Sequence, residues 1–130
     1  MQAGYSGTPL PKKLGIKPGS RVRLLNAPAG FSLHDLPEGT SLSESDFDVA
    51  VAFCTRVAEI EEAINILRPN MAIDGGIWLA WPKKSSGVPS ECHDGNVRTI
   101  GLSTGLVDNK VCAINEVWSA LRFVIRVKDR

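Results

Sequence analysis

Five consecutive apolar residues, Ile77 to Trp81, lead directly into the polar segment Pro82 to Gly87. A strand with no polar alternation is buried on both faces, which is typical of a parallel sheet covered by helices. A second apolar run, Val49 to Phe53, has the same character. The two runs predict neighbouring central strands whose carboxyl ends lie at one edge of the sheet, where ligands of open α/β sheets bind.

The segment between the two apolar runs has the pattern of an amphipathic helix. Apolar residues recur at helical spacing from Val57 to Leu67, which predicts a helix from Arg56 to about Asn70. Thr55 is placed to cap this helix, and Asp74 to Gly76 are placed to turn the chain into the next strand. Strand, helix and strand then form a right-handed βαβ unit.

Alternating and turn-bounded segments predict the remaining elements. Expected are a first strand at 21–25, a short edge strand near 41–45, a second helix from Pro89 and Ser90 to about Thr104, and final strands at 107–114 and 118–127. Only Asn115, Glu116 and Val117 join the last two strands, and such a short link demands antiparallel pairing.

These elements predict an α/β fold: a Rossmann-like three-layer sandwich with a mainly parallel sheet closed by a C-terminal antiparallel hairpin. A chain of 130 residues with 43% hydrophobic composition suits one compact domain. Residues 1–130 are therefore expected to form a single domain, with residues 1–20 as an N-terminal arm packed on it.

Charge and composition exclude several function classes. A net charge of +1 provides no global field for nucleic acid or an anionic membrane, and no apolar run approaches the ~20 residues that span a bilayer. Without a secretory signal in the sequence, a cytoplasmic protein with reduced thiols is expected. The three cysteines lack metal-site spacing, so no metal site is predicted.

The charges are nevertheless unevenly distributed. All five charges from Lys12 to Arg23 are positive, whereas Asp35 to Glu62 contains eight acids and the single base Arg56. A solvated surface accounts for this pattern, and a docking face is the alternative.

The candidate ligand site follows the apolar run Ile77 to Trp81. Ammonium groups, hydroxyls and a nearby helix N-terminus together suit phosphate or carboxylate. Side chains at the neighbouring strand ends, Asn26 and Thr55, are expected to contribute. The alternative is a loop whose lysines only keep it soluble. The predicted anion-binding residues are Asn26, Thr55, Lys83, Lys84, Ser85 and Ser86.

Other reactive side chains have weaker patterns. Cys54 directly precedes a predicted helix N-terminus, which can lower a thiol pKa, but a catalytic thiol would need His34 or His93 beside it. Inert packing of Cys54 is the alternative. Trp81 could stack on a planar ligand or pack in the core. No catalytic residues are therefore assigned, and no cofactor is predicted.

The order of elements resembles the second half of a class I S-adenosylmethionine methyltransferase. At finer grain the chain resembles a bacterial family known as domain of unknown function 3052, through the stretches Gly4 to Leu10, Lys13 to Gly19, Trp81 to Lys84 and Lys110 to Trp118. That family implies a fold but no established activity. A methyltransferase would also need a glycine-rich turn after its first strand and an acid ending the next one.

The sequence departs from the methyltransferase pattern at both of those positions. The turn is Asn26 to Gly30, in which Pro28 removes an amide donor, and neither Asp35 nor Glu38 clearly ends a strand. The principal hypothesis is therefore a noncatalytic module that binds a small anion or an acidic protein segment. The alternatives are an S-adenosylmethionine-binding or methyltransferase-like enzyme and a protein interaction or assembly domain. The oligomeric state is not predicted.

Overall fold

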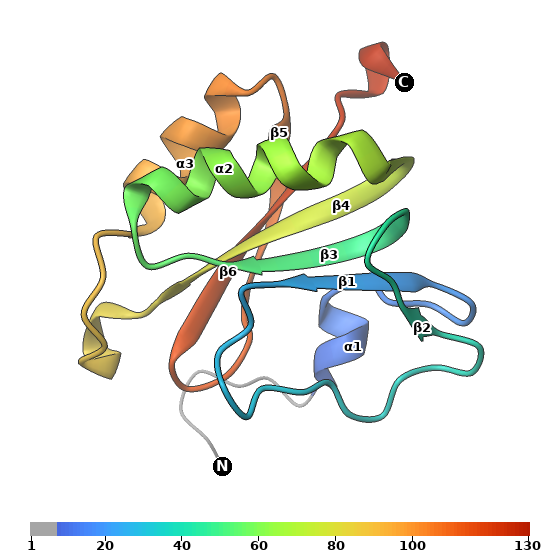
Figure 1. Ribbon diagram of the computed structural model, residues 1–130, viewed down its shortest axis with the longest axis horizontal. Helices are drawn as coiled ribbons and strands as arrows, with labels where there is room; N and C mark the ends of the chain where they lie inside the picture. The colour runs from blue at the N-terminus through green and yellow to red at the C-terminus, as the bar shows by residue number, and fades with distance from the viewer. Residues whose placement is uncertain (1–7) are drawn as a thin grey trace.

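The computed structural model describes residues 8–130, which form one six-stranded mixed sheet with the order β2-β1-β3-β4-β6-β5 (Figure 1). The first four strands in that order are parallel, β6 is antiparallel to β4, and β5 is antiparallel to β6. The strands are β1 (Arg21–Leu25), β2 (Ser41–Leu42), β3 (Phe47–Phe53), β4 (Met71–Pro82), β5 (Val107–Ala113) and β6 (Trp118–Val124). The first seven residues of the predicted N-terminal arm lie outside the described range.

The two apolar runs lie side by side as predicted. Val49 to Phe53 pair in parallel with Gly76 to Ala80, and both strands are buried at these positions. The predicted C-terminal hairpin is also present, although its second strand ends at Val124, three residues before the predicted end. The predicted edge strand near 41–45 is limited to Ser41 and Leu42.

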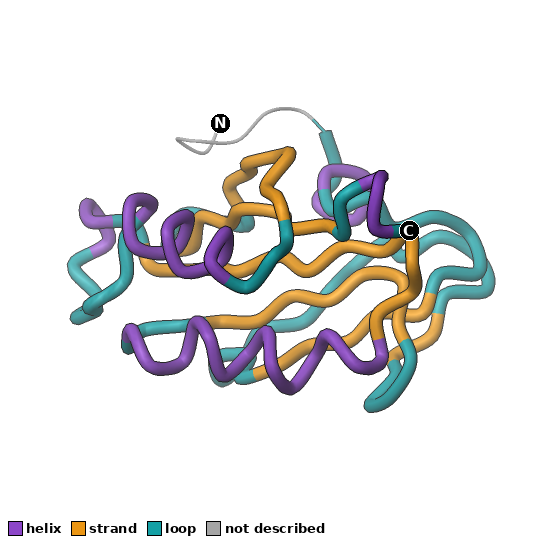
Figure 2. Tube along the Cα trace, turned by 90° about the horizontal axis from the view of Figure 1, so that it is seen from above, coloured by secondary structure: helices purple, strands orange, loops and turns teal. Residues whose placement is uncertain are grey.

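Helices α2 (Val57–Leu67) and α3 (Asp94–Ser103) lie over one face of the sheet, and the short helix α1 (Leu10–Lys13) lies on the other (Figure 1). In Figure 2 the two longer helices run beside the orange strands. The face on the α1 side is therefore covered by a four-residue helix and by loops rather than by a long helix. The described residues also contain three 3-10 turns: η1 (Arg68–Asn70), η2 (Lys84–Ser86) and η3 (Val127–Asp129).

Each face of the sheet has its own core. The α2–α3 face buries Phe47, Ala50, Ala52, Ile60, Ile64, Leu67, Ile77, Leu79, Val97, Leu121 and Phe123. The α1 face buries Leu14, Ile16, Val22, Val49, Val51, Phe53, Trp78, Ala80, Ile114, Trp118 and Ala120. The indole Nε1 of Trp78 donates a hydrogen bond to the Leu14 carbonyl at 3.0 Å, which fastens residues after α1 to the sheet.

Both long helices begin later than predicted. The N-cap of α2 is Arg56 rather than Thr55, and α3 starts at Asp94 rather than at Pro89 and Ser90. In α3 the His93 ring Nδ1 accepts hydrogen bonds from the amides of Gly95 and Asn96, so His93 supplies the cap. Gly105, at φ +93°, is the left-handed residue after α3.

The turn predicted at Asp74 to Gly76 is wrong, because these residues lie inside β4. Phe47 pairs with Met71 and Val49 with Gly76, so four residues of β4 face the single residue Asp48. This irregularity works as a bulge. A side chain at Gly75 would meet the Asp48 carbonyl oxygen at 2.7 Å, which explains the glycine there.

Candidate functional site

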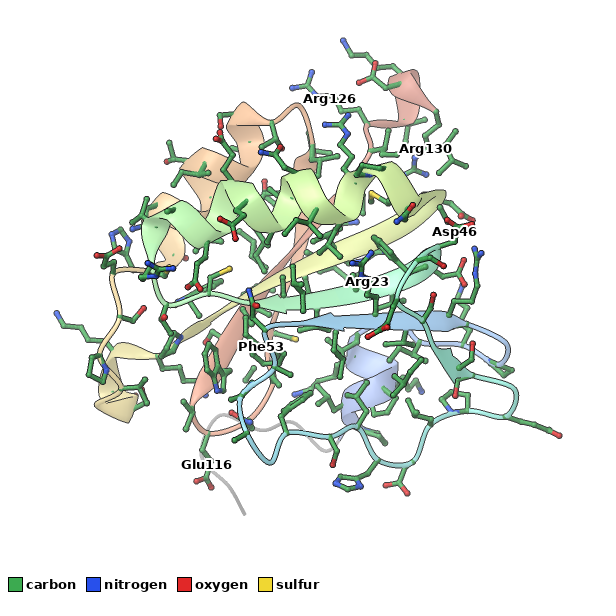
Figure 3. All side chains as sticks on the ribbon, viewed as in Figure 1. Arg23, Asp46, Phe53, Glu116, Arg126 and Arg130 are labelled. Atoms are coloured by element: carbon green, nitrogen blue, oxygen red, sulfur yellow. The ribbon has the colours of Figure 1, made fainter. Side chains whose placement is uncertain are left out.

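An aromatic cluster stands at the carboxyl edge of the parallel strands. The Phe53 ring lies 4.9 Å from the ring of Phe31 and 5.0 Å from that of Trp118, both in edge-to-face geometry. Phe53 ends β3, Phe31 belongs to the loop after β1, and Trp118 begins β6. Figure 3 labels Phe53 at this edge and Asp46 at the opposite, amino edge. Three segments that are distant in sequence therefore meet at the end of β3.

A cavity of about 470 Å³ opens beside this cluster. Its volume is in the range of small-molecule sites, which are typically about 300–1,000 Å³. Among the described residues, the polar lining side chains are Ser32, His34 and Asn115, and neither Lys nor Arg contributes. The remaining lining residues are Leu10, Pro28, Ala29, Gly30, Phe31, Ile114, Val117 and Trp118. The cavity is therefore suited to apolar or aromatic groups.

We call this cavity the aromatic cavity. The turn between β5 and β6 forms one of its walls. The Asn115 side-chain oxygen accepts hydrogen bonds from the amides of Val117 and Trp118, each at 2.9 Å. Such a side-chain-to-backbone turn is a common role of Asn. The Val117 carbonyl also accepts a 2.7 Å hydrogen bond from the Lys83 amide, which joins this wall to the segment after β4.

The predicted anion-binding residues are spread along the same edge, but none of the six lines the aromatic cavity. Lys84 and Ser85 are exposed in η2, and Asn26 is exposed in a left-handed conformation with φ +58°. The Ser86 hydroxyl donates to the Lys83 carbonyl at 2.6 Å, so it stabilises its own turn. The grouping of these residues as an anion site stays a prediction.

Carboxylates already bind the amides at the start of α2. Glu59 Oε1 accepts hydrogen bonds from the amides of Thr55 and Arg56, each at 2.9 Å, and Glu91 Oε1 accepts one from the Val57 amide at 2.9 Å. Burial alone would raise the pKa of Glu59, but the bonds from Thr55 and Arg56 outweigh it and lower the pKa. An external anion at Thr55 would have to displace a side chain of the protein.

The thiols show no sign of activation. Burial raises the pKa of Cys54 to about 12, and Cys92 has a raised pKa for the same reason. The Cys54 Sγ contacts the Glu59 carbonyl at 3.8 Å, whereas His93 is bonded to the amides of α3. The structure therefore favours inert packing of Cys54. Among residues 8–130, no three His, Cys, Asp or Glu side chains gather in a way that could hold a metal ion.

The sequence did not indicate the aromatic cavity, because its walls come from residues 28–34 and 114–118, which carry no recognised motif. The usable signal was the pair Asn115 and Trp118, an Asn turn followed by a large aromatic side chain. Trp81, the predicted stacking residue, is buried on the α2–α3 face and does not line the cavity. No helix among residues 8–130 has the length and apolar character needed to cross a bilayer.

Comparison with known proteins reveals similarity only at the level of the fold. No protein family and no curated protein matches the sequence, so the resemblance to domain of unknown function 3052 stays a prediction. A solved structure described as a pericyclic reaction enzyme superposes with a TM-score of 0.50 at 13% identity, covering 92% of this chain and 47% of that chain.

Two structures of LepI are also similar. The LepI complex with SAM gives a TM-score of 0.47, and a LepI variant with SAH and a substrate analogue gives 0.49. Both show 16% identity and cover 90% of this chain but 39% of theirs. The chain thus spans less than half the length of these structures. At such identities the similarity to the pericyclic reaction enzyme shows a shared α/β fold and nothing about activity.

Proposed function

We propose that this protein binds a small molecule with a flat apolar or aromatic ring in the aromatic cavity at the carboxyl edge of its sheet. The observation that carries the proposal is the packing of Phe31, Phe53 and Trp118 beside a cavity of about 470 Å³. Aromatic walls favour a planar ring through offset or edge-to-face contacts. Ser32, His34 and Asn115 provide the few polar groups that orient a ligand.

The position of the cavity in the sheet supports this proposal. From β1 the chain continues to β2 on one side and then to β3 on the other side of β1. The order in which strands are added to the sheet therefore changes direction between β1 and β3. Open α/β sheets bind ligands outside the carboxyl ends of strands at such a reversal. Phe31 follows β1 and Phe53 ends β3, so the cavity lies beside that point.

The predicted anion site extends the same proposal. The Lys83 amide is hydrogen-bonded to Val117, which lines the cavity, and the Lys83 and Lys84 side chains therefore start close to its rim. A ligand with a ring in the cavity and an anionic group outside it would satisfy both features. Binding without catalysis is the expected activity.

A second candidate is an S-adenosylmethionine-binding, methyltransferase-like domain with a Rossmann-like sandwich. Its support is the sheet itself, in which antiparallel β6 lies between β4 and β5, and the cavity beside the loop after β1. Against it, Pro28 lies in that loop, and Asp35 and Glu38 lie in the connection before β2 rather than at a strand end. The adenine ring of that cofactor would make it one member of the proposed ligand class.

The test is a titration of ¹⁵N-labelled protein, followed by amide NMR shifts, with adenosine, adenosine monophosphate, S-adenosylmethionine and S-adenosylhomocysteine. Saturable shifts at residues 29–34 and 114–118 are the expected result. Tighter binding of adenosine monophosphate than of adenosine would add support for Lys83 and Lys84. A preference for the two methionine-containing compounds would favour the second candidate.

Two matched variants separate binding in the cavity from binding elsewhere. Ala29 lines the cavity and Ala27 does not, although both are exposed in the same loop. Ala29→Trp is expected to fill the cavity and weaken binding by about tenfold or more, equivalent to about 1.4 kcal/mol, whereas Ala27→Trp leaves it unchanged. Equal effects of the two variants, or no saturable shifts with any of the four compounds, would overturn the proposal.

A further inference from the structure

A second cavity, of about 460 Å³, lies on the α1 face at the opposite, amino edge of the parallel strands. Four basic side chains line it: Lys13, Lys17, Lys110 and Arg122. They come from α1, the loop after it, β5 and β6. Part of the positive segment from Lys12 to Arg23 is therefore not a uniformly solvated surface, because two of its lysines converge on β5 and β6.

We call this second cavity the cationic cavity. Among the basic side chains that line it, Arg122 is unusual. Its Nε atom is buried and has no hydrogen-bond partner among residues 8–130. A buried, unpaired nitrogen of a charged group is costly and rare in folded proteins, so it calls for an explanation. Burial lowers the pKa of Arg122, and the nearby charge of Arg130 lowers it further.

The backbone of β4 makes room for the Arg122 guanidinium. Arg122 pairs with Trp78 across β4 and β6, and its side chain extends over Gly76. A Cβ atom at Gly76 would overlap with Arg122 Nε and lie 2.9 Å from Cζ. The guanidinium thus packs against the backbone of Gly76, in space that the side chain of any other residue at position 76 would occupy.

Within residues 8–130, no acidic side chain forms an ion pair with Arg122. The lining includes Asp48 and Asp74. Asp48 is bound by Arg21, whose backbone amide, Nε and Nη2 donate to its carboxylate at 2.8, 3.2 and 3.1 Å. Asp74 is exposed and forms no ion pair with a basic side chain within the described part of the chain. Lys13 Nζ donates to the Ala113 carbonyl at 2.8 Å, which joins the end of α1 to the end of β5.

We infer that the cationic cavity binds a small molecule through a phosphate or carboxylate group, with Arg122 as the central contact and Lys13, Lys17 and Lys110 around it. A guanidinium presents several donors in a plane and matches such oxyanions in a bidentate manner. The anion would supply the negative charge that balances the guanidinium of Arg122. The cavity exceeds the size of one phosphate, so the rest of the ligand has space beside the anionic group.

The experiment uses the full chain and two probes, inorganic phosphate and citrate, added at constant ionic strength at pH 7.5 with chloride as the reference. The ¹H–¹⁵Nε signal of Arg122 and the amide signals of 13–17, 19, 20 and 110 are expected to shift saturably. Phosphate or citrate should also raise the melting temperature, because the ligand binds the folded state. Preference for one probe would identify the anionic group.

Three variants test the role of Arg122. Arg122→Met should weaken binding of the preferred probe by about tenfold or more, since it removes charge-assisted hydrogen bonds. Gly76→Ala keeps the charge but displaces the guanidinium, and should weaken binding in the same direction. Arg126→Met removes a charge that lies beyond the end of β6 and outside the lining, and should leave affinity unchanged. The amide spectrum of each variant establishes that it is folded.

Several outcomes would overturn the inference. These are shifts that never saturate, equal losses in Arg122→Met and Arg126→Met, or binding of an acidic peptide such as tetraglutamate without binding of either probe. This test can be distinguished from the test of the aromatic cavity. The amide signals that report on the aromatic cavity, at 29–34 and 114–118, come from residues that do not line the cationic cavity.

Discussion

The two edges of the sheet hold cavities of similar volume but opposite chemistry. The carboxyl edge is built from aromatic rings around Phe53, and none of the described residues that line its cavity is basic. At the amino edge, four described basic side chains and two aspartates line the cavity, and Arg122 has a buried nitrogen without a hydrogen-bond partner among residues 8–130. Apolar packing stabilises the fold wherever it occurs, whereas an unpaired buried charge opposes folding. The aromatic cluster of the carboxyl edge thus stabilises the fold, whereas the cluster of basic side chains at the amino edge does not, which is the reason for proposing an anionic ligand there.

The largest expected effect comes from the aromatic cluster. Phe53 is 2% exposed and touches two rings, so Phe53→Ala should lower the free energy of unfolding by about 3–5 kcal/mol. Arg122→Met should change it by less than about 1 kcal/mol, or raise it, because an apolar side chain replaces an uncompensated charge. Urea denaturation in phosphate-free buffer measures both values. Comparable losses in the two variants would contradict the contrast between the edges.

Gly76→Ala should have an intermediate effect. The new methyl group overlaps with Arg122, and overpacking of this kind costs about 1–3 kcal/mol, with the lower end expected because the long side chain can move. The cost should disappear when Arg122 is Met. A double-mutant cycle by urea denaturation measures this coupling. Additive effects would show that Gly76 is required for some other reason.

Glu59→Ala should lower the free energy of unfolding by about 0.5–2 kcal/mol, since the start of α2 loses its acceptor. The pKa of Glu59 is lowered in the folded protein, so its contribution is present above about pH 4.3 and is lost as pH falls through the folded pKa. The difference from wild type should therefore shrink in acid. Glu62→Ala, on the same helix and exposed, is the matched control.

The smallest effect is expected at the ion pair of the amino edge. Arg21 and Asp48 are partly exposed, and such pairs contribute about 0–1 kcal/mol. The Arg21 hydrogen bond lowers the pKa of Asp48, so this stability is present above about pH 3.9 and is lost as pH falls. The Asp48→Asn variant should not show this loss of stability in acid. Addition of 1 M salt should reduce the difference in stability between the wild type and the variant. The melting temperatures of the wild type, of Asp48→Asn and of the control variant Glu44→Gln measure this difference in stability.

The apolar runs were sufficient to predict the central strands, because a run such as Val49 to Phe53 is buried on both faces only in a covered sheet. The start of α2 was mispredicted because Thr55 matched the preferred cap residues, whereas Glu59 reaches back from the first turn to bind the amides there. The turn at Asp74 to Gly76 failed because glycines that permit a bulge look the same in sequence as glycines that permit a turn.

The cavities could not be predicted because each is formed by residues that are distant in sequence. Trp118 and Phe31 come together because each ring packs against Phe53, and Arg122 and Lys17 line one cavity because the segment after α1 covers that face of the sheet. A single sequence shows the charge of each lysine but not which of them converge. Lys83 and Lys84 were favoured because they adjoin one another and follow a clear strand, which is local information.

The hydrogen bond from Trp78 to Leu14 has a practical meaning for anyone who shortens this chain. Leu14 is 0% exposed and Ile16 is 4% exposed, so the segment that precedes the first strand closes one side of the interior. Proteolytic removal of residues up to 20 would open a hydrophobic surface around the indole, and aggregation would follow. The segment Val127 to Arg130, by contrast, is exposed and contains a single short turn, so changes there would uncover no such surface.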